Sequence, residues 1–361
     1  MDEQRVQSYA YDCMAGWLMI TSKELAKLAG VSQSTVSRAL NDSPLISDDM
    51  KSKIKLLAKE QRFEMNSQAK SLKTHRTETI GILFPRFFMN LSTNLYFTYL
   101  YDSLQVELSK YDYDLLVIYD SKQTDALSPL EKMIKRRKVD GLILVKSDLS
   151  GDEMDILGRS KLPFVSIFCD YDEPGDSKYA INTYNGGVLA GLHYARYTEY
   201  LPLYVGSHMD SSDSSNRLNG FRYGLASGGM SRSEIETITC GMSVPQAYEA
   251  VMQHRAVFAT KRSVYVYNDL IACGILMALK DLGIAVPKQV QLISNDDIPM
   301  ASWMTPSLST LRFPTKHLIT VACQRLVREI VSGNLEKENM QLSPELVLRG
   351  TTVEQGHIIT C

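Results

Sequence analysis

The sequence predicts an α/β protein in which a small all-helical domain precedes two lobes built on parallel sheets. Three short helical patterns with clear start signals lie within residues 19–65. From Thr79 onward, short apolar runs alternate with amphipathic helical stretches, a pattern typical of parallel sheets covered by helices on both faces. About 280 residues follow this pattern, which favours two lobes over one.

The first helix is predicted to begin at "TSKE", residues 21–24. This stretch has the form of a capping box, in which the Thr hydroxyl and the Glu carboxylate satisfy backbone amides at a helix start. Leu25, Leu28 and Ala29 then form one apolar face, and Gly30 ends the helix.

Two further helices are predicted in the same domain. The second, "QSTVSRALN", follows a tight turn and is capped by Ser32, and the third starts at residues 47–49. The residues expected to face inward are Val36, Ala39 and Leu40 in the second helix and Ile54, Leu57 and Ala58 in the third. Three short helices, the first two joined by a tight turn, indicate a helix-turn-helix domain.

Seven apolar runs are predicted as strands of the two lobes. They cover residues 80–84, 115–119, 141–145, 164–168, 203–206, 263–267 and 291–294. Amphipathic segments between them, predicted as helices, include residues 100–110, 131–137, 218–226, 247–254 and 270–282. Because ligands bind beyond the carboxyl ends of such strands, the polar residues 268–269 and 295–297 mark a candidate site.

Charge is distributed unevenly along the chain. The net charge is −2, yet residues 19–76 carry eleven Lys and Arg against six Asp and Glu. That segment is therefore about +5 and the remainder about −7, which suggests a basic module on an acidic body.

Several classes of protein are disfavoured by what the sequence lacks. The six cysteines include no C-x-x-C pair and no His at ligand spacing, so neither a disulfide framework nor a metal site is expected. The sequence has no signal-peptide pattern and no 18-residue apolar stretch, which favours a cytoplasmic protein without a membrane span. No nucleotide-binding, hydrolase or zinc-protease motif occurs, so we expect neither an enzyme nor a cofactor.

The exposed side of the second helix has the chemistry of a DNA-reading surface. Gln33 and Ser34 suit hydrogen bonds to base edges, Ser37 lies on the same side, and Arg38 suits a guanine or a phosphate. The alternative is an ordinary solvated helix face, because helix-turn-helix look-alikes are common.

The stretch "ITSKELAKLAGVSQSTVSRALNDSPLISDDMKSKI", followed by "NSQAKSLK", closely resembles the headpiece of LacI-type regulators, the lactose and galactose repressor family. The similarity continues through "KVDGLILV", "NRLNGFRYGL" and "LISNDDIPMA", and covers residues 19 to about 353. The resemblance implies a homodimeric repressor that binds operator DNA and has a two-lobed core like periplasmic sugar-binding proteins. It also implies a hinge helix within residues 66–76, whose Ala69 and Leu72 enter the minor groove, and a tail at residues 354–361.

The resemblance also implies an effector site between the lobes. Motif by motif, it selects Arg217, Asn268 and Asp296, a guanidinium, an amide and a carboxylate that suit adjacent hydroxyls. Phe97 is expected in the family's aromatic position, with Asn94 nearby. The alternative readings are that Asp297 caps a turn, that Asp269 caps the helix after it, and that Arg217 pairs with a carboxylate of its own lobe.

Departures from the family pattern bear on the effector and the hinge. The loop at residues 85–97 is longer than usual, Phe168 replaces an aspartate, residues 182–183 are Asn-Thr instead of Asp-Asn, and "GMSVPQ" lacks the usual aromatic. These changes suggest a disaccharide, an acidic or phosphorylated sugar, or another molecule unlike the common hexoses. Met65 stands where a proline is usual, which predicts a hinge that is slower to order.

Three functions are compared. A repressor requires a basic headpiece and a binding core in one chain, and both are predicted here. A sugar receptor without DNA binding requires the core alone, and an enzyme requires catalytic groups.

The tail "EQGHIITC" has no leucine heptad, so we expect a dimer. Residues 1–18 are expected to be a disordered extension, or to precede a true start at Met19.

The hinge assignment predicts the effect of Leu72→Ala. A leucine wedge opens a base step at a cost of a few kcal/mol, which wider DNA contacts offset. The variant should bind operator about tenfold or more weakly and bend it less, as measured by gel mobility, with effector binding intact. Unchanged operator affinity would identify residues 66–73 as a simple linker.

Overall fold

The computed structural model describes residues 20–63, 76–85, 95–119, 127–145, 149–168, 177–207, 212–230, 235–333, 337–353 and 358–359. The chain divides into an N-terminal unit, Met1–Thr77, and a core, Glu78–Cys361. Four predictions lie outside the described residues: the 1–18 extension, the hinge pair Ala69 and Leu72, Asn94, and most of the tail.

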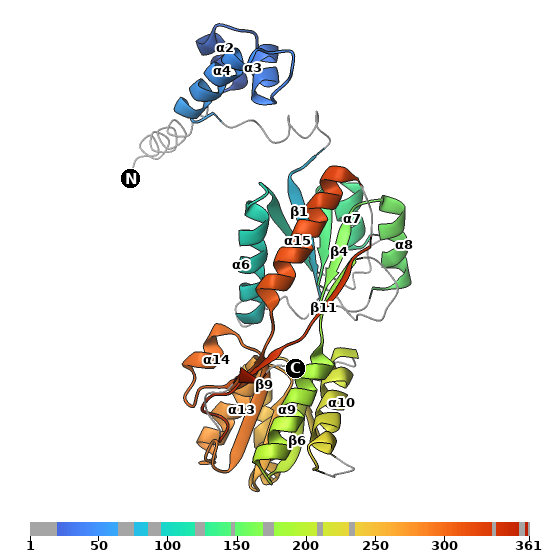
Figure 1. Cartoon of the computed structure of the whole chain (residues 1–361), viewed down its shortest axis with the longest axis vertical. Coiled ribbons are helices and arrows are strands. Elements are labelled where there is room, and N and C mark those ends of the chain that lie inside the picture. Colours follow the sequence, from blue (N-terminus) through green and yellow to red (C-terminus); the bar gives the residue numbers. More distant parts are fainter. Residues whose placement is uncertain are drawn as a thin grey trace, which may run out of the picture. The chain divides into compact units, whose positions relative to one another are not determined.

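The N-terminal unit contains three helices in its described part: α2 (Ser22–Ala29), α3 (Gln33–Leu40) and α4 (Asp48–Glu60) (Figure 1). The predicted capping box is present, since the Thr21 amide donates to Glu24 Oε2 at 2.8 Å and the Glu24 amide donates to Thr21 Oγ1 at 3.3 Å. Gly30 ends α2 with φ at 69°, a left-handed conformation that favours glycine. Ser32 and Ser47 cap α3 and α4.

The small core of this unit differs from the prediction at one position. Leu25, Ala26 and Ala29 of α2 are buried, whereas Leu28 is 58% exposed. At 3.6 residues per turn, Leu28 lies roughly 110° around the helix from the centre of the buried face. The prediction of Leu28 as an inward residue was therefore wrong, and Ala26 takes its place.

The first lobe of the core, the N-lobe, contains a parallel sheet. Its strands are β1 (Thr79–Phe84), β2 (Asp114–Tyr119), β3 (Gly141–Leu144), β4 (Phe164–Ile167), β5 (Ser177–Ile181) and β11 (Asn339–Leu342). Their order is β11-β5-β4-β3-β1-β2. Helices α6 (Leu95–Ser109) and α15 (Thr315–Ser332) cover one face, and α7 (Pro129–Lys135) and α8 (Gly151–Ser160) cover the other.

The second lobe, the C-lobe, contains a mixed sheet. Its strands are β6 (Leu201–Ser207), β7 (Glu236–Cys240), β8 (Arg262–Val266), β9 (Val290–Asp296), β10 (Ser309–Arg312), β12 (Glu345–Val347) and β13 (Ile358–Ile359), in the order β13-β12-β10-β9-β8-β6-β7. The pairs that β12 makes with β10 and β13 are antiparallel. Its helices are α9 (Thr183–Tyr197), α10 (Ser212–Ser227), α11 (Val244–Gln253), α12 (Arg255–Phe258), α13 (Asp269–Asp281) and α14 (Pro299–Trp303).

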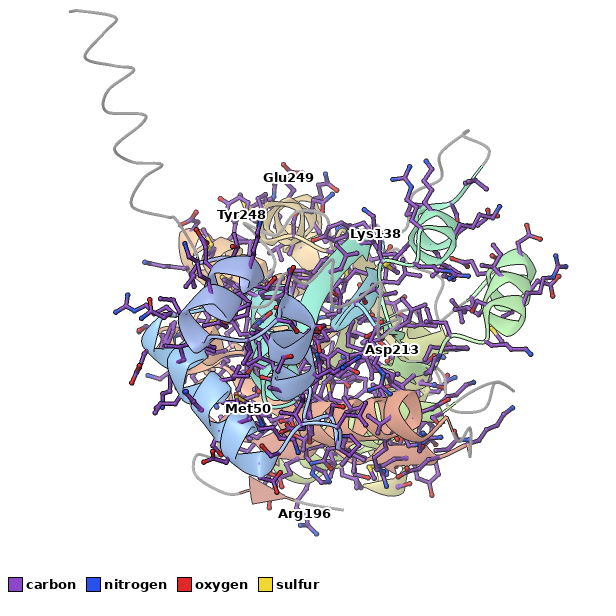
Figure 2. The ribbon with its side chains drawn as sticks, turned by 90° about the horizontal axis from the view of Figure 1, so that it is seen from above. Met50, Lys138, Arg196, Asp213, Tyr248 and Glu249 are labelled. Atoms are coloured by element: carbon purple, nitrogen blue, oxygen red, sulfur yellow. The ribbon has the colours of Figure 1, made fainter. Side chains whose placement is uncertain are left out.

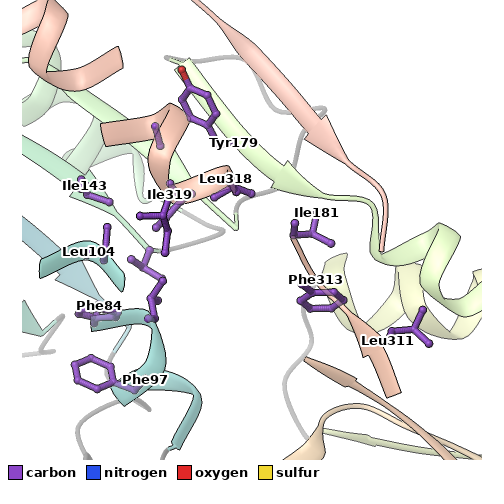
Figure 3. Packing of buried hydrophobic residues seen from close by; sticks show 14 of the residues in the cluster. Phe84, Phe97, Leu104, Ile143, Tyr179, Ile181, Leu311, Phe313, Leu318 and Ile319 are labelled. Carbon is purple, nitrogen blue, oxygen red and sulfur yellow. The ribbon is translucent and has the colours of Figure 1, made fainter. Parts of the chain in front are cut away.

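The predicted fold class is confirmed, and each predicted strand is present with both ends within two residues of the predicted ones. The chain passes between the lobes three times, from β5 to α9, from β10 to α15 and from β11 to β12. Buried apolar side chains extend from the N-lobe past Ile181 and Phe313, at two of these crossings, to Leu311 in the C-lobe (Figure 3).

Close packing of two C-lobe helices depends on glycines. A Cβ at Gly187 or Gly191 of α9 would overlap the backbone of α10, and one at Gly220 or Gly224 would overlap the backbone of α9. Because these positions lack side chains, the two helix backbones come into direct contact, which fixes α10 and the side chains on it.

This contact predicts opposite effects for two glycine-to-alanine changes. Gly220→Ala places a methyl against the Tyr184 carbonyl and should destabilise the core by about 1–3 kcal/mol or more. The control, Gly158→Ala in α8, meets no atom within 4 Å and should stabilise by about 0.5–1 kcal/mol through helix propensity. Thermal unfolding monitored by circular dichroism measures both, and equal effects would contradict the packing argument.

Candidate functional site

The four residues predicted to read DNA all lie on α3 of the N-terminal unit. Gln33, Ser34 and Arg38 are exposed, and Ser37 is half-buried. The Gln33 side-chain amide donates to Ser22 Oγ, and the Ser34 hydroxyl lies 2.8 Å from Ser32 Oγ. These contacts hold two polar side chains at the amino-terminal end of α3, where a recognition helix approaches base edges.

The positive charge of this unit is partly neutralised within it. Lys51 pairs with Asp48 at 2.9 Å, and Lys55 pairs with Asp42. Lys53 and Arg62 are exposed. Exposed cations of this kind attract phosphates without regard to sequence.

In the core, Arg217 is a buried guanidinium with several partners. Its Nε and Nη2 both lie 3.0 Å from Asp213 Oδ2, and its Nη1 donates to the Tyr267 carbonyl at 2.6 Å. Its charge also lies over the ring of Tyr267, 4.5 Å from the centroid, and near that of Phe313, at 5.5 Å. The alternative reading of Arg217, a pair with a carboxylate of its own lobe, is therefore what the structure shows.

Asp213 is ionised because of these contacts. Burial alone would raise its pKa, but the Arg217 charge and hydrogen bonds from neighbouring side chains hold the pKa of Asp213 below its usual range. One such bond comes from the Tyr267 hydroxyl at 3.0 Å. The i to i+4 spacing of Asp213 and Arg217 on a helix was a sequence signal that could have identified this pair.

Asn268 takes the helix-capping role that was the alternative foreseen for Asp269. The Asn268 side-chain oxygen accepts from the Ile271 amide at 2.9 Å and so caps α13. Asp269 is fully buried inside the first turn, where its two oxygens accept from the Ile298 amide at 3.0 Å and the Thr310 hydroxyl at 2.8 Å. Asp269 therefore ties α13 to the segment after β9 and to β10.

Asp296 ends β9 and Asp297 follows it, with φ at 109° and 53°. Both residues therefore have positive φ angles, and their two carboxyl groups have different surroundings. Asp297 does not cap the following turn, because its oxygens accept from Arg312 Nε and Arg349 Nη2, each at 2.6 Å. Asp296 has no hydrogen-bond donor among the described residues.

The Asp296 carboxyl lies in a strongly charged environment. Burial first, and then the Asp269 carboxylate, raise the pKa of Asp296, while the Arg217 charge opposes this shift. Burial likewise raises the pKa of Asp269. Arg217, Asp213 and Asp269 thus lie near enough to Asp296 for their charges to shift its pKa.

The N-lobe contributes different aromatic residues from the one predicted. Phe97 is 4% exposed and packs in the N-lobe core, with its ring centroid 4.5 Å from that of Phe84 (Figure 3). Its neighbour Tyr96 has a pKa raised well above its usual range by burial and by the Asp296 carboxylate of the other lobe. Tyr96 also meets Phe168 edge-on, with the two ring centroids 6.0 Å apart.

The structure does not bring Phe97 together with Arg217, Asn268 and Asp296. Its assignment to effector binding stays a prediction, as do those of the other three residues. Tyr96 is a candidate that sequence reasoning missed, because its approach to Asp296 depends on how the two lobes meet. Phe168 adopts a left-handed conformation with φ at 55°, which no local pattern indicated.

Two other kinds of site were searched for in the described ranges. No helix there combines the length and hydropathy that crossing a bilayer requires. No group of three or more His, Cys, Asp and Glu side chains in the same ranges is arranged to hold a metal ion.

Comparison with protein families gives two matches. Residues 21–66 match the model described as bacterial regulatory proteins, lacI family, and residues 200–352 match the periplasmic binding protein-like domain. The chain is 27% identical to the HTH-type transcriptional repressor PurR of Photobacterium profundum, over 92% of this chain and 98% of that protein. It is also 27% identical to the ribose operon repressor of Escherichia coli K12, over 92% and 100% of the two chains.

Solved structures show the same fold. The lac repressor dimer bound to operator and an anti-inducer superposes with a TM-score of 0.75 at 18% identity, covering 93% of this chain and 100% of that one. The regulator CelR in complex with cellobiose gives a TM-score of 0.67 at 21% identity, covering 92% and 99%.

Asp269 and Asp297 both bind groups around the segment after β9. Replacing each carboxylate with a neutral amide is expected to change the stability of the core in opposite directions. Asp269→Asn keeps both hydrogen bonds, since an amide oxygen can accept from Ile298 and an amide nitrogen can donate to Thr310. An unfolded Asp titrates near about 4, and the folded carboxyl titrates higher, so wild-type stability falls as pH rises above about 4. At pH 8 the variant should be more stable than wild type, on the order of 1–3 kcal/mol, with the difference vanishing in acid.

The matched control is Asp297→Asn, which removes the charge that pairs with Arg312 and Arg349. This variant should lose about 1–3 kcal/mol at pH 8. Urea unfolding of the three proteins at pH 5 and pH 8 gives the comparison. If Asp269→Asn were less stable than wild type at pH 8, the ionised carboxylate would be stabilised by its surroundings, and the prediction would be wrong.

Proposed function

Because the chain belongs to the lacI family of bacterial regulatory proteins, we propose that it is a transcriptional repressor whose affinity for operator DNA is controlled by a small effector. The observation that carries the proposal is the presence in one chain of a capped helix-turn-helix unit and of a core with a buried polar cluster around Arg217 and Asp296. The transcriptional repressor PurR and the ribose operon repressor, to which the chain is similar, support the same reading.

DNA recognition is assigned to α3. Gln33 and Ser34 contact base edges, while Ser37 and Arg38 contact bases or phosphates farther along the same helix. Two copies of the chain bind a near-palindromic operator, one half-site each, and Ala69 and Leu72 enter the minor groove between the half-sites. The operator-bound dimer of the lac repressor, which shares the fold, supports this arrangement.

Effector binding is assigned to the facing ends of the two lobes. Asp296, whose carboxylate has no donor among the described residues, accepts hydrogen bonds from the effector, with Arg217 and Asn268 beside it and Tyr96 and Phe168 covering the other side. The effector is a sugar or a sugar derivative, the class that the cellobiose complex and the ribose-bound regulators of this fold support. The aromatic rings favour stacking on the apolar face of such a ring.

Coupling follows from the segment that joins the site to a lobe crossing. Asp296 lies in the proposed site. Its neighbour Asp297 accepts a hydrogen bond from Arg312, which lies three residues before the start of α15 in the other lobe. An effector that reorders this segment therefore changes the relation between the lobes and hence the spacing of the two DNA-binding units. Because a repressor acts where its operator DNA lies, we expect this protein to act in the cytoplasm.

A receptor without DNA binding and an enzyme are the two rival functions. The capped α2–α4 unit argues against the receptor. The relatives named as repressors, and a polar cluster in which Arg217 and Asp213 neutralise each other, argue against an enzyme.

The proposal is tested by selecting duplex DNA from the genome of the source organism with the purified protein. A thermal-shift screen of sugars and sugar phosphates runs in parallel. We expect one enriched near-palindrome and at least one sugar that changes its affinity. Failure to enrich any sequence, with and without every sugar that binds, would rule out the repressor.

Two variants should separate the two assigned sites. Gln33→Ala should weaken binding to the selected operator by about 10–100-fold, with binding to mixed-sequence DNA unchanged, because a base contact contributes about 1–3 kcal/mol of discrimination. Asp296→Ala should keep operator affinity and lose the response to the sugar. Fluorescence anisotropy measures both, and a Gln33→Ala protein with wild-type operator affinity would move recognition away from that side chain.

A further inference from the structure

A run of exposed cations follows the helix α7 of the N-lobe. Arg136, Arg137 and Lys138 succeed one another directly after Lys135, the last residue of α7, and all four side chains are exposed. Lys135 pairs with Glu131 at 2.7 Å, whereas no carboxylate in the described part of the chain pairs with Arg136, Arg137 or Lys138. We call these three residues the basic run.

The basic run lies at the amino-terminal edge of the N-lobe sheet. It immediately precedes Val139, Asp140 and the start of β3, which pairs in parallel with β1. Figure 2 labels Lys138 in a view from above. A helix that connects two parallel strands ends at this edge of the sheet, and the basic run follows the carboxyl end of α7 directly. Cations are favoured there by the helix dipole.

The same edge is where the core begins. The Glu78 amide donates to Asp140 Oδ2 at 2.9 Å, and the Asp140 amide donates to the Thr79 carbonyl at 2.8 Å. Lys138, the last residue of the basic run, thus lies two residues before Asp140, which is hydrogen-bonded to Glu78 and Thr79 at the start of the core. The chain that connects to the DNA-binding unit leaves the core beside the basic run.

Neighbouring charges make the run a distinct surface. On the β4 side of β3 lie exposed Lys161 and the Arg159–Asp155 pair, and on the far side of β1 lie exposed Asp112 and Asp114. The nearest carboxylate, Asp140, accepts the Glu78 amide. Since residues 77–361 carry a net charge of about −5, three successive cations here are opposite in sign to the core as a whole.

We propose that Arg136, Arg137 and Lys138 are a second DNA contact, in which the core binds phosphates of the same duplex that the N-terminal unit reads. The proposal rests on the DNA binding proposed above and adds a contact to it. A duplex held by the N-terminal unit is tethered to this edge of the core by the chain itself. Guanidinium and ammonium groups bind phosphate oxygens and release condensed counterions, which gives affinity without sequence preference.

This contact has a defined signature in salt. Each phosphate neutralised contributes about −0.9 to the slope of log affinity against log salt concentration. Three cations in each chain make six in a dimer, so the contact contributes up to about five units of slope. Specific and non-specific DNA share the effect, because phosphates carry no sequence information.

The test compares the full-length protein with the triple variant Arg136→Gln, Arg137→Gln, Lys138→Gln. The probe is mixed-sequence duplex DNA, with the selected operator as a second probe, titrated over a range of potassium chloride concentrations. We expect the slope to become shallower by about 2 to 5 units and the affinity near 0.15 M salt to fall by about 10–100-fold on both probes.

The matched control removes three exposed cations from the C-lobe: Arg255→Gln, Lys280→Gln and Lys288→Gln. These residues also lie near helix ends or before a strand, and the change in net charge is the same. We expect wild-type slope and affinity from this control, and unchanged thermal unfolding from both variants.

Two outcomes overturn the inference. If the triple variant and the wild type share one slope, the basic run is a solvated surface or serves an anionic protein. If the control loses as much slope as the triple variant, the effect is one of net charge. A wild-type protein that binds neither probe would instead refute the proposed DNA binding itself, so the two failures are distinguishable.

Discussion

The core is organised around one buried charge, the Arg217 guanidinium. A cation removed from water requires an opposite charge and hydrogen-bond acceptors in fixed places, or it strongly destabilises the fold. Here Asp213 supplies the charge from the same helix, the Tyr267 carbonyl supplies an acceptor from the end of β8, and two aromatic rings cover the planar face. The glycines between α9 and α10 allow this helix to lie close enough for the arrangement to form.

The carboxyl groups around Arg217 follow from that constraint. One of them, Asp213, is committed to the guanidinium, so Asp296 and Asp269 must share a region in which little positive charge is left to balance them. Asp297, one residue from Asp296, avoids the problem by facing two other arginines. These four carboxyl groups thus differ in role because their nearest cations differ.

Sequence reasoning identified what depends on local chemistry. The capping box at Thr21, the glycine stop at residue 30 and the apolar runs of the central strands were predicted because neighbours in sequence determine them. Helix α9 was not identified, since it is buried on most sides and carries no clear polar face. Strand β5, "SKYAI", has polar residues at its start that become buried when β11 pairs with it from about 160 residues away.

The candidate site divides in the same way. The motifs that follow β8 and β9 identified Asn268 and Asp296, and the family resemblance added Arg217. The capping role of Asn268, the two arginines on Asp297 and the approach of Tyr96 to Asp296 all depend on segments brought together by the fold. No pattern within a single stretch of sequence contains that information.

The three crossings between the lobes also determine the order in which the molecule can be completed. Strands β6 to β10 of the C-lobe come from one continuous stretch of chain, with α9 just before it. The N-lobe begins first in the sequence, yet it lacks α15 on one face and β11 at one edge until residues 315–342 have been synthesised. As the chain leaves the ribosome, the earlier part of the N-lobe must therefore wait with apolar surface uncovered while the C-lobe strands emerge, and long-range closure of this kind slows folding.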